Sequence, residues 1–171
     1  LLGPEVLELG RQAALGLAAL HARGVVHRDV KPSNLFVGAR EGRLRVTIID
    51  LGVARSASSS LVTRHGMMIG TPSYMSPEQV LGREDVGPRS DLFSLGVVLF
   101  ELIARERPYR AGDIFGLVAK IALTDPPRLS SVAPDAPAAL DDLVAKAMAK
   151  EPSDRYASAL EMARALEAAP P

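Results

Sequence analysis

The segment from Asp91 to Ala104 limits most strongly how this chain can fold. It reads Asp-Leu-Phe-Ser-Leu-Gly-Val-Val-Leu-Phe-Glu-Leu-Ile-Ala and is apolar on nearly every side of a helix. Such a helix belongs in the middle of a domain, because no face of it is suited to water. Ser90 or Asp91 can cap its start. We therefore expect a helical domain built around this segment, and 171 residues are enough for one domain with its own core.

The rest of the chain predicts further helices and one small hairpin. Pro4 and Gly24 suit the two ends of the first helix. Two short runs of strand-forming residues, 35–37 and 44–49, are joined by a connector with glycines, which predicts a β-hairpin. Residues 53–75 show no periodicity and are expected to be irregular. The predicted class is α+β, mainly α, a helical domain carrying a small hairpin. Apolar residues at helical spacing predict helices over 4–23, 113–122, 138–150 and 158–168.

Composition excludes several classes of partner and site. Lys plus Arg (20) equals Asp plus Glu (20), so net charge does not indicate nucleic acid or an anionic membrane. The absence of cysteine excludes disulfides and thiolate metal sites, and it fits a reducing, cytoplasmic location. The longest apolar run, 95–100, is far too short to span a bilayer. We expect no nucleic acid and no membrane contact within this segment.

The loop His27–Asn34 gathers an acid, a base, a guanidinium and an amide within eight residues. Pro32 prevents a regular helix there, so the polar groups point into one small volume. The hairpin brings Asn34, before its first strand, near Asp50, after its second. An amide and a carboxylate are hard oxygen donors of the kind that Mg²⁺ prefers. Taken singly, these residues are also ordinary turn formers, and only their combination favours chemistry.

Three motifs, His27-Arg28-Asp29-Val30-Lys31-Pro32-Ser33-Asn34, Asp50-Leu51-Gly52 and Ser76-Pro77-Glu78, stand in the order found in protein kinases. Together they resemble the C-terminal lobe of the bacterial, eukaryotic-like protein serine/threonine kinases. The resemblance implies ATP and Mg²⁺, or Mn²⁺ in its place, as cofactors. It implies Asp29 and Lys31 as catalytic residues, and Asn34 and Asp50 as metal ligands. The residues implied in nucleotide binding are Lys31, Ser33, Asn34, Phe36 and Asp50.

The resemblance also implies a regulatory loop, the activation segment 50–78. Arg28 would pair there with a phosphorylated residue, for which Thr63 is the best candidate. Bacterial relatives often carry a second threonine two positions on, where this chain has His65, so single phosphorylation is expected. Thr71 would contact the catalytic pair Asp29 and Lys31.

Five residues are implied to act in structure. His27 and Leu51 match an apolar column that links the two lobes of a kinase. Glu78 and Arg155 match a buried ion pair that anchors the activation segment. Asp91 matches an aspartate that holds the catalytic loop from below.

Motifs of the upper lobe are missing from the sequence. No Gly-rich phosphate loop and no strand lysine precede residue 27, and the chain starts with Leu1 rather than Met. We therefore expect residues 1–171 to be the C-terminal lobe alone, truncated at its N-terminal side and nearly inactive by itself. Its partners would be ATP, protein substrates bearing Ser or Thr, and the missing N-terminal lobe of the parent protein. The face around His27, Leu51 and Phe36 should then be an exposed apolar patch.

Two other interpretations remain at this stage. One is a non-catalytic, pseudokinase-like scaffold, against which the full set of Asp29, Lys31, Asn34 and Asp50 argues. The other is an unrelated helical interaction domain, which requires all four matches to be chance.

Overall fold

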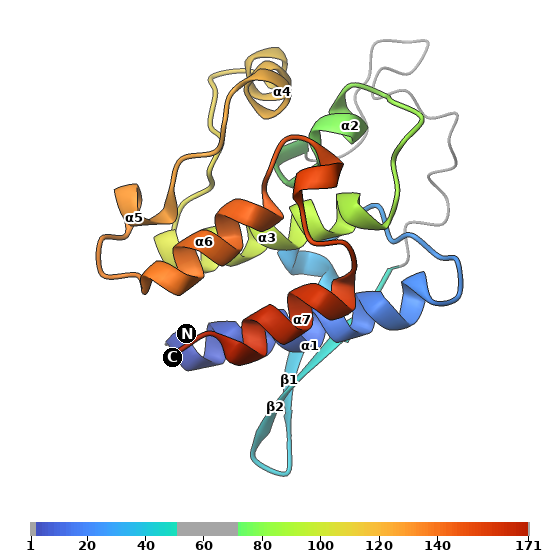
Figure 1. Ribbon diagram of the computed structural model, residues 1–171, viewed down its shortest axis with the longest axis vertical. Helices are drawn as coiled ribbons and strands as arrows, with labels where there is room; N and C mark the ends of the chain where they lie inside the picture. Colours follow the sequence, from blue (N-terminus) through green and yellow to red (C-terminus); the bar gives the residue numbers. More distant parts are fainter. Residues whose placement is uncertain (1–2, 51–71, 171) are drawn as a thin grey trace.

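Helix α3 (Pro88–Ala104) lies at the centre of the structure, and helices α1, α5, α6 and α7 pack against it (Figure 1). The computed structural model describes residues 3–50 and 72–170. Every residue from Ser90 to Phe100 is buried, as the apolar sequence predicts. The predicted cap is wrong: α3 begins at Pro88, with Gly87 before it, and the Gly87 N–H donates to Ser90 Oγ at 3.2 Å. Proline suits this first position because its missing N–H would have no partner in the helix.

The remaining long helices lie where apolar spacing predicts them, with ends that differ by up to three residues. They are α1 (Gly3–His21), α4 (Ile114–Leu123), α6 (Ala138–Ala147) and α7 (Ala159–Ala168). The chain leaves α1 through Gly24, whose φ of +73° explains the glycine. Five short elements have too few residues for periodicity to reveal them. They are helices α2 (Pro77–Val80) and α5 (Leu129–Val132) and the 3₁₀ turns η1 (Pro32–Asn34), η2 (Pro72–Tyr74) and η3 (Pro152–Asp154).

Strands β1 (Leu35–Arg40) and β2 (Arg43–Ile48) form an antiparallel hairpin that extends away from the helices (Figure 1). Strand β1 is longer than predicted, and β2 has the predicted length but begins one residue earlier, because the expected connector 38–43 is itself mostly paired. Only Glu41 and Gly42 make the turn, with φ of 54° and 73°, the combination that matches the twist of two-residue hairpins.

Gln12 of α1 attaches the hairpin to the helices. Its Nε2 donates to the Leu44 carbonyl at 2.9 Å, and its Oε1 accepts from the Val46 N–H at 3.0 Å. The side-chain amide therefore pairs with the edge of β2 as another strand would. This contact fixes the direction of the strand that leads to Asp50.

Close packing of α3 against α6 requires glycine at position 96. A Cβ there would lie 2.9 Å from Ala147 Cβ and 2.9 Å from Met148 Cγ. We expect Gly96→Ala to lower the free energy of unfolding by about 1–3 kcal/mol, despite the better helix propensity of alanine. Gly10→Ala is the matched control, because its Cβ would meet only the ends of side chains, Leu99 Cδ2 at 2.8 Å and Leu166 Cδ1 at 3.4 Å. Urea denaturation should show the smaller loss for Gly10→Ala; equal losses would contradict this account.

Candidate active site

Asp91 holds the polar loop from the central helix. Its Oδ1 accepts the Arg28 N–H at 2.7 Å, and its Oδ2 accepts the His27 N–H at 2.9 Å. The same Oδ2 lies 2.8 Å from Nε2 of His21, at the end of α1. Asp91 is almost fully buried, and these contacts provide the hydrogen bonds that a buried carboxylate requires. The position of the loop is therefore set by α3 and α1 together.

Arg28 has a left-handed backbone conformation, with φ of 64°. Such a conformation is uncommon for a residue other than glycine and persists where surrounding contacts impose it. Its N–H is held by Asp91, and its carbonyl accepts from Nε2 of Gln79, in α2, at 2.9 Å. Two helices thus clamp the peptide groups on both sides of Arg28. The residue after it, Asp29, is aimed by this clamp.

Asp29, Lys31 and Asn34 form one hydrogen-bonded cluster. Lys31 Nζ donates to Asp29 Oδ2 at 2.8 Å, and Asn34 Nδ2 donates to the same oxygen at 3.1 Å. Asn34 Nδ2 also donates to the Asp29 main-chain carbonyl at 2.8 Å. Asn34 is buried, whereas Asp29 and Lys31 are each about one quarter exposed, at 25% and 26% of their side chains. The cluster is therefore anchored by the buried Asn34, and its Asp29 carboxylate is accessible to solvent.

The hairpin brings its two ends together beside this cluster. The Ile49 N–H donates to the Asn34 carbonyl at 3.0 Å, one step beyond the pair Leu35 and Ile48. Asp50 follows immediately, is exposed, and has a left-handed φ of 55°. Aspartate tolerates this conformation better than most residues. Ser33 contributes only a weak contact, from its Oγ to Asn34 Oδ1 at 3.5 Å.

His27 is completely buried, which agrees with a structural role, so His27 itself is not part of the exposed apolar patch expected around it. Its Nε2 donates to the Ile49 carbonyl at 3.2 Å, and its Nδ1 accepts the Asp29 N–H at 3.2 Å. Both ring nitrogens are used within the chain, which explains the burial. Exposed apolar side chains do occur nearby on the hairpin: Phe36 is 63% exposed, Val37 44% and Ile49 38%. Phe36 also lines an open hollow beside β2.

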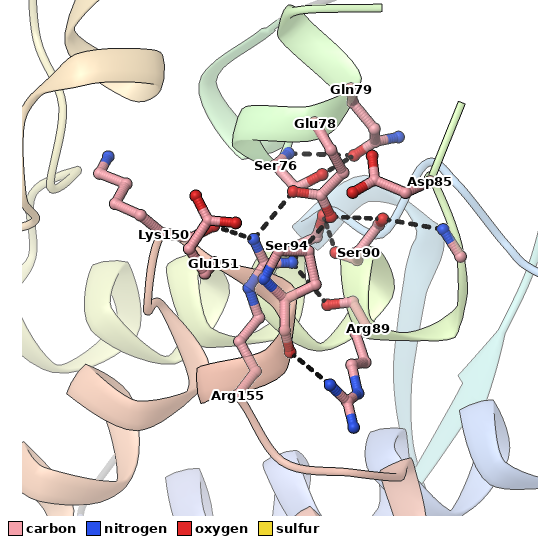
Figure 2. Close-up of polar contacts among 12 residues, drawn as sticks. Ser76, Glu78, Gln79, Asp85, Arg89, Ser90, Ser94, Lys150, Glu151 and Arg155 are labelled. Atoms are coloured by element: carbon pink, nitrogen blue, oxygen red, sulfur yellow. Dashed lines mark hydrogen bonds and ion pairs between the residues drawn. The ribbon is translucent and has the colours of Figure 1, made fainter. Parts of the chain in front are cut away.

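Glu78 and Arg155 form a buried, bidentate ion pair (Figure 2). Arg155 Nη1 lies 2.7 Å from Glu78 Oε1, and Nη2 lies 2.8 Å from Oε2. Ser90 donates to Glu78 Oε1 at 2.6 Å. The guanidinium also donates to three main-chain carbonyls, so each of its five N–H groups has a partner. Those carbonyls belong to Arg89, Ala149 and Lys150, at 3.0, 2.8 and 2.8 Å.

The Glu78 carboxylate is held in its charged form. Burial by itself raises the pKa of Glu78, but the hydrogen bonds and charge of Arg155, with the hydrogen bond from Ser90, outweigh it. The pKa of Glu78 therefore lies below its ordinary value. A carboxylate of this kind adds stability above its unfolded-state pKa, and the contribution is lost as pH falls through the lower folded-state pKa.

This shift predicts a pH dependence. The difference in unfolding free energy between the native chain and Glu78→Gln should be constant well above pH 4.5 and shrink as pH falls below it. Glutamine does not titrate, so the change reports Glu78 alone. Urea denaturation at several pH values between about pH 3 and pH 6 measures it. A difference that grows on acidification would contradict the sign of the shift.

Three residues singled out in the sequence, Leu51, Thr63 and Thr71, lie outside the described residues. The segment that directly follows Thr71 is described and is anchored to α3: Tyr74 donates its hydroxyl to Glu101 Oε2 at 2.6 Å. Burial, with the Glu101 carboxylate, raises the pKa of Tyr74 to about 12.

Sequence reasoning missed His21 and Gln79, and it considered Ser90 only as a helix cap, not as a donor to Glu78. His21 is 70 positions from Asp91 and Gln79 is 51 from Arg28, so no local pattern links these pairs. Gln79 did carry one signal. It stands three residues after Ser76, the spacing of a capping box, and its Oε1 does accept the Ser76 N–H at 3.0 Å.

Comparison with known proteins agrees with this geometry. The profile described as "Protein kinase domain" matches residues 4–167. Serine/threonine-protein kinase Pkn1 of Myxococcus xanthus is 40% identical over 166 residues, 96% of this chain and 24% of Pkn1. Serine/threonine-protein kinase PknL of Mycobacterium tuberculosis is 40% identical over 154 residues, 90% of this chain and 37% of PknL.

Solved structures give the same result. The crystal structure of the Mycobacterium tuberculosis PknI kinase domain has a TM-score of 0.71 and 30% identity, and the match covers 98% of this chain and 56% of that one. The chain belongs to the protein kinase domain family, and its similar proteins are bacterial serine/threonine kinases. It spans about a quarter of the length of Pkn1 and somewhat more than a third of that of PknL.

Within residues 3–50 and 72–170, none of the helices combines the length and apolar character needed to cross a membrane.

Proposed function

We propose that the protein containing this chain transfers the γ-phosphate of ATP to serine and threonine hydroxyls of other proteins. Residues 1–171 would form the C-terminal lobe of its kinase domain, with residues 50–78 as the activation segment. The observation that carries the proposal is the convergence of Lys31 Nζ and Asn34 Nδ2 on one oxygen of Asp29. The proposal places the protein in the cytoplasm, where ATP and protein substrates are available.

Asp29 would orient the acceptor hydroxyl and accept its proton. Its carboxylate is partly exposed, so a substrate hydroxyl can reach it, and its direction is fixed by Asn34. Lys31 Nζ, already beside this carboxylate, would offset negative charge that develops on the transferred phosphate. In both roles the side chain is already held in position by the hydrogen bonds described above.

Asn34 and Asp50 are the residues that would hold Mg²⁺. Asn34 directs its Nδ2 to Asp29, which leaves its Oδ1 as the atom available to a hard cation. Asp50 supplies a carboxylate from the other end of the hairpin and is exposed. Bound there, the ion would neutralise charge on the ATP phosphates. Both donors are oxygens, which suits Mg²⁺ or Mn²⁺.

The proposal also includes an upper lobe in the parent protein. Phe36, Val37 and Ile49 are exposed apolar side chains on the hairpin, where an adenine ring and a second lobe would bury them. Phosphorylation of Thr63 would order the activation segment through Arg28, with Thr71 against Asp29 and Lys31. Phosphosite mapping of the active protein tests this part: an unmodified Thr63 would remove it.

The test of the main proposal is phosphate transfer from radiolabelled ATP by the full-length protein. Asp29→Asn should reduce the rate at least about 100-fold, because general-base groups typically contribute that much. Asp135→Asn, a change of an exposed carboxylate in another loop, is the matched control and should leave the rate unchanged. Equal transfer by native protein and Asp29→Asn would overturn the proposal, and so would ATP binding without any transfer, which a scaffold would show.

A further inference from the structure

Gln79, the third residue of α2, uses both ends of its side-chain amide. Its Oε1 accepts the Ser76 N–H at 3.0 Å and the Ser76 hydroxyl at 3.2 Å. Its Nε2 donates to the main-chain carbonyl of Arg28 at 2.9 Å. Only this orientation of the amide suits all three partners, since an oxygen turned toward Arg28 would face another oxygen. The amide therefore connects the start of α2 to the loop that carries Asp29.

The carbonyl that Gln79 holds belongs to the peptide group between Arg28 and Asp29. The N–H of the same peptide group, that of Asp29, donates to His27 Nδ1 at 3.2 Å. Arg28 depends on such contacts, because its φ of 64° is a left-handed conformation that an arginine rarely adopts unaided. Rotation of this peptide group would turn the backbone of Asp29, and with it the carboxylate.

Helix α2 is itself held in place through Glu78, the residue before Gln79 (Figure 2). Glu78 is paired with Arg155 and accepts a hydrogen bond from Ser90, and all three side chains are buried. Gln79 reaches Arg28, which lies 51 positions earlier in the chain. A single turn of helix thus links the buried ion pair to the peptide group that Gln79 holds.

A capping role alone does not account for Gln79. In a capping box the third helical residue is glutamine or glutamate, because only an acceptor oxygen is required. Glu161 takes the same position in α7: its carboxylate accepts the Ala157 N–H at 2.8 Å, and its own N–H donates to Ser158 Oγ at 3.1 Å. Gln79 adds a donor, which a charged carboxylate does not have.

We infer that Gln79 is a positioning residue for phosphate transfer, which holds the Asp29 carboxylate in its direction by donating a hydrogen bond to the Arg28 carbonyl. The inference rests on the proposed function of Asp29 as the group that orients the acceptor hydroxyl. Displacement of a catalytic group by about 1 Å can lower a rate about 100-fold. The KM for ATP should change little, because the hydrogen bonds of Gln79 go to Ser76 and Arg28, not to the residues proposed to hold the nucleotide.

Two substitutions separate the donor from the cap. Gln79→Glu keeps an acceptor for Ser76 and removes the donor to Arg28, whereas Gln79→Met removes both groups at a similar side-chain length. Glu161→Gln is the matched control, because it is the reverse exchange at the same position of α7. Phosphate transfer from radiolabelled ATP to dephosphorylated casein by the full-length protein gives kcat and the KM for ATP, and urea denaturation checks that each variant is folded.

Both Gln79→Glu and Gln79→Met should lower kcat about 10- to 100-fold, with a change in the KM for ATP of less than about threefold. Glu161→Gln should match the native protein. Hydrogen exchange at 27–29 should become several-fold faster in both Gln79 variants. A loss of kcat confined to Gln79→Met would assign the effect to the cap of α2 and overturn the inference, as would native kcat in both variants.

The two readouts also distinguish this inference from the proposed function. Absence of phosphate transfer by the native protein would refute the proposed function, and hydrogen exchange at 27–29 would still decide whether Gln79 holds the loop. Unchanged exchange in both Gln79 variants would overturn the inference even if the native protein transfers phosphate. Faster exchange with native kcat would overturn it too, because the contact would then have no part in positioning Asp29.

Discussion

Replacement of Arg155 by Met should lower the free energy of unfolding by at least about 4 kcal/mol, a large part of the stability of a typical domain. The side chain is fully buried, and the change leaves the Glu78 carboxylate without its counter-charge. It also removes the donors to the carbonyls of Arg89, Ala149 and Lys150. Urea denaturation of the intact protein measures the loss.

Glu78→Gln should cost less, about 3 kcal/mol, because the guanidinium keeps its three carbonyl partners and loses the charge pairing and one of its two hydrogen bonds to Glu78. The double variant Glu78→Met/Arg155→Met should be more stable than the sum of the losses of Glu78→Met and Arg155→Met predicts, since neither charge is then stranded. If the losses of unfolding free energy in the single variants simply added up in the double variant, the two side chains would not be energetically coupled.

The exposed pair Arg83 and Asp85 is the control for this cycle. Its guanidinium lies 2.7 Å from the carboxylate, but both side chains are more than 40% exposed. Solvent screens such a pair, so Arg83→Ala should leave the unfolding free energy nearly unchanged. A large loss of unfolding free energy in Arg83→Ala would mean that burial does not determine how much an ion pair stabilises this protein.

Elements were predictable from the sequence where one physical pattern dominates. The central helix follows from the apolar run 91–104, and the meeting of Asn34 with the end of β2 follows from strand pairing alone. The start of α3 was missed because Asp91 resembles a cap. Its carboxylate instead binds the loop 64 residues earlier, a contact that no local rule contains.

The same limit applies to the site. Asp29, Lys31 and Asn34 lie close in sequence, so their contact could be expected from the loop itself. The clamp on Arg28 depends on Gln79 and Asp91, which arrive from two different helices. The burial of His27 depends on the Ile49 carbonyl, and short-range patterns say nothing of that partner. Long-range polar contacts of this kind require the folded arrangement.

Asp91→Asn should lower the unfolding free energy by about 3–5 kcal/mol and loosen the loop 27–29. An amide offers one acceptor oxygen and turns its NH₂ toward the N–H of either His27 or Arg28, where two donors would oppose each other. Without that bond the left-handed conformation of Arg28 loses one side of its clamp. Hydrogen exchange should be faster at 27–29, and phosphate transfer by the full-length protein should fall with it.

Asp141→Asn is the matched control for this prediction. Asp141 is also a buried carboxylate that accepts a main-chain N–H, from Leu129 at 2.8 Å, but it stands in α6, away from the loop. Its replacement should also reduce stability while leaving exchange at 27–29 unchanged. If hydrogen exchange at 27–29 were equally fast in Asp91→Asn and Asp141→Asn, Asp91 would have no specific role in holding the loop. A difference between them at equal stability would show that α3 holds Asp29 in place through Asp91.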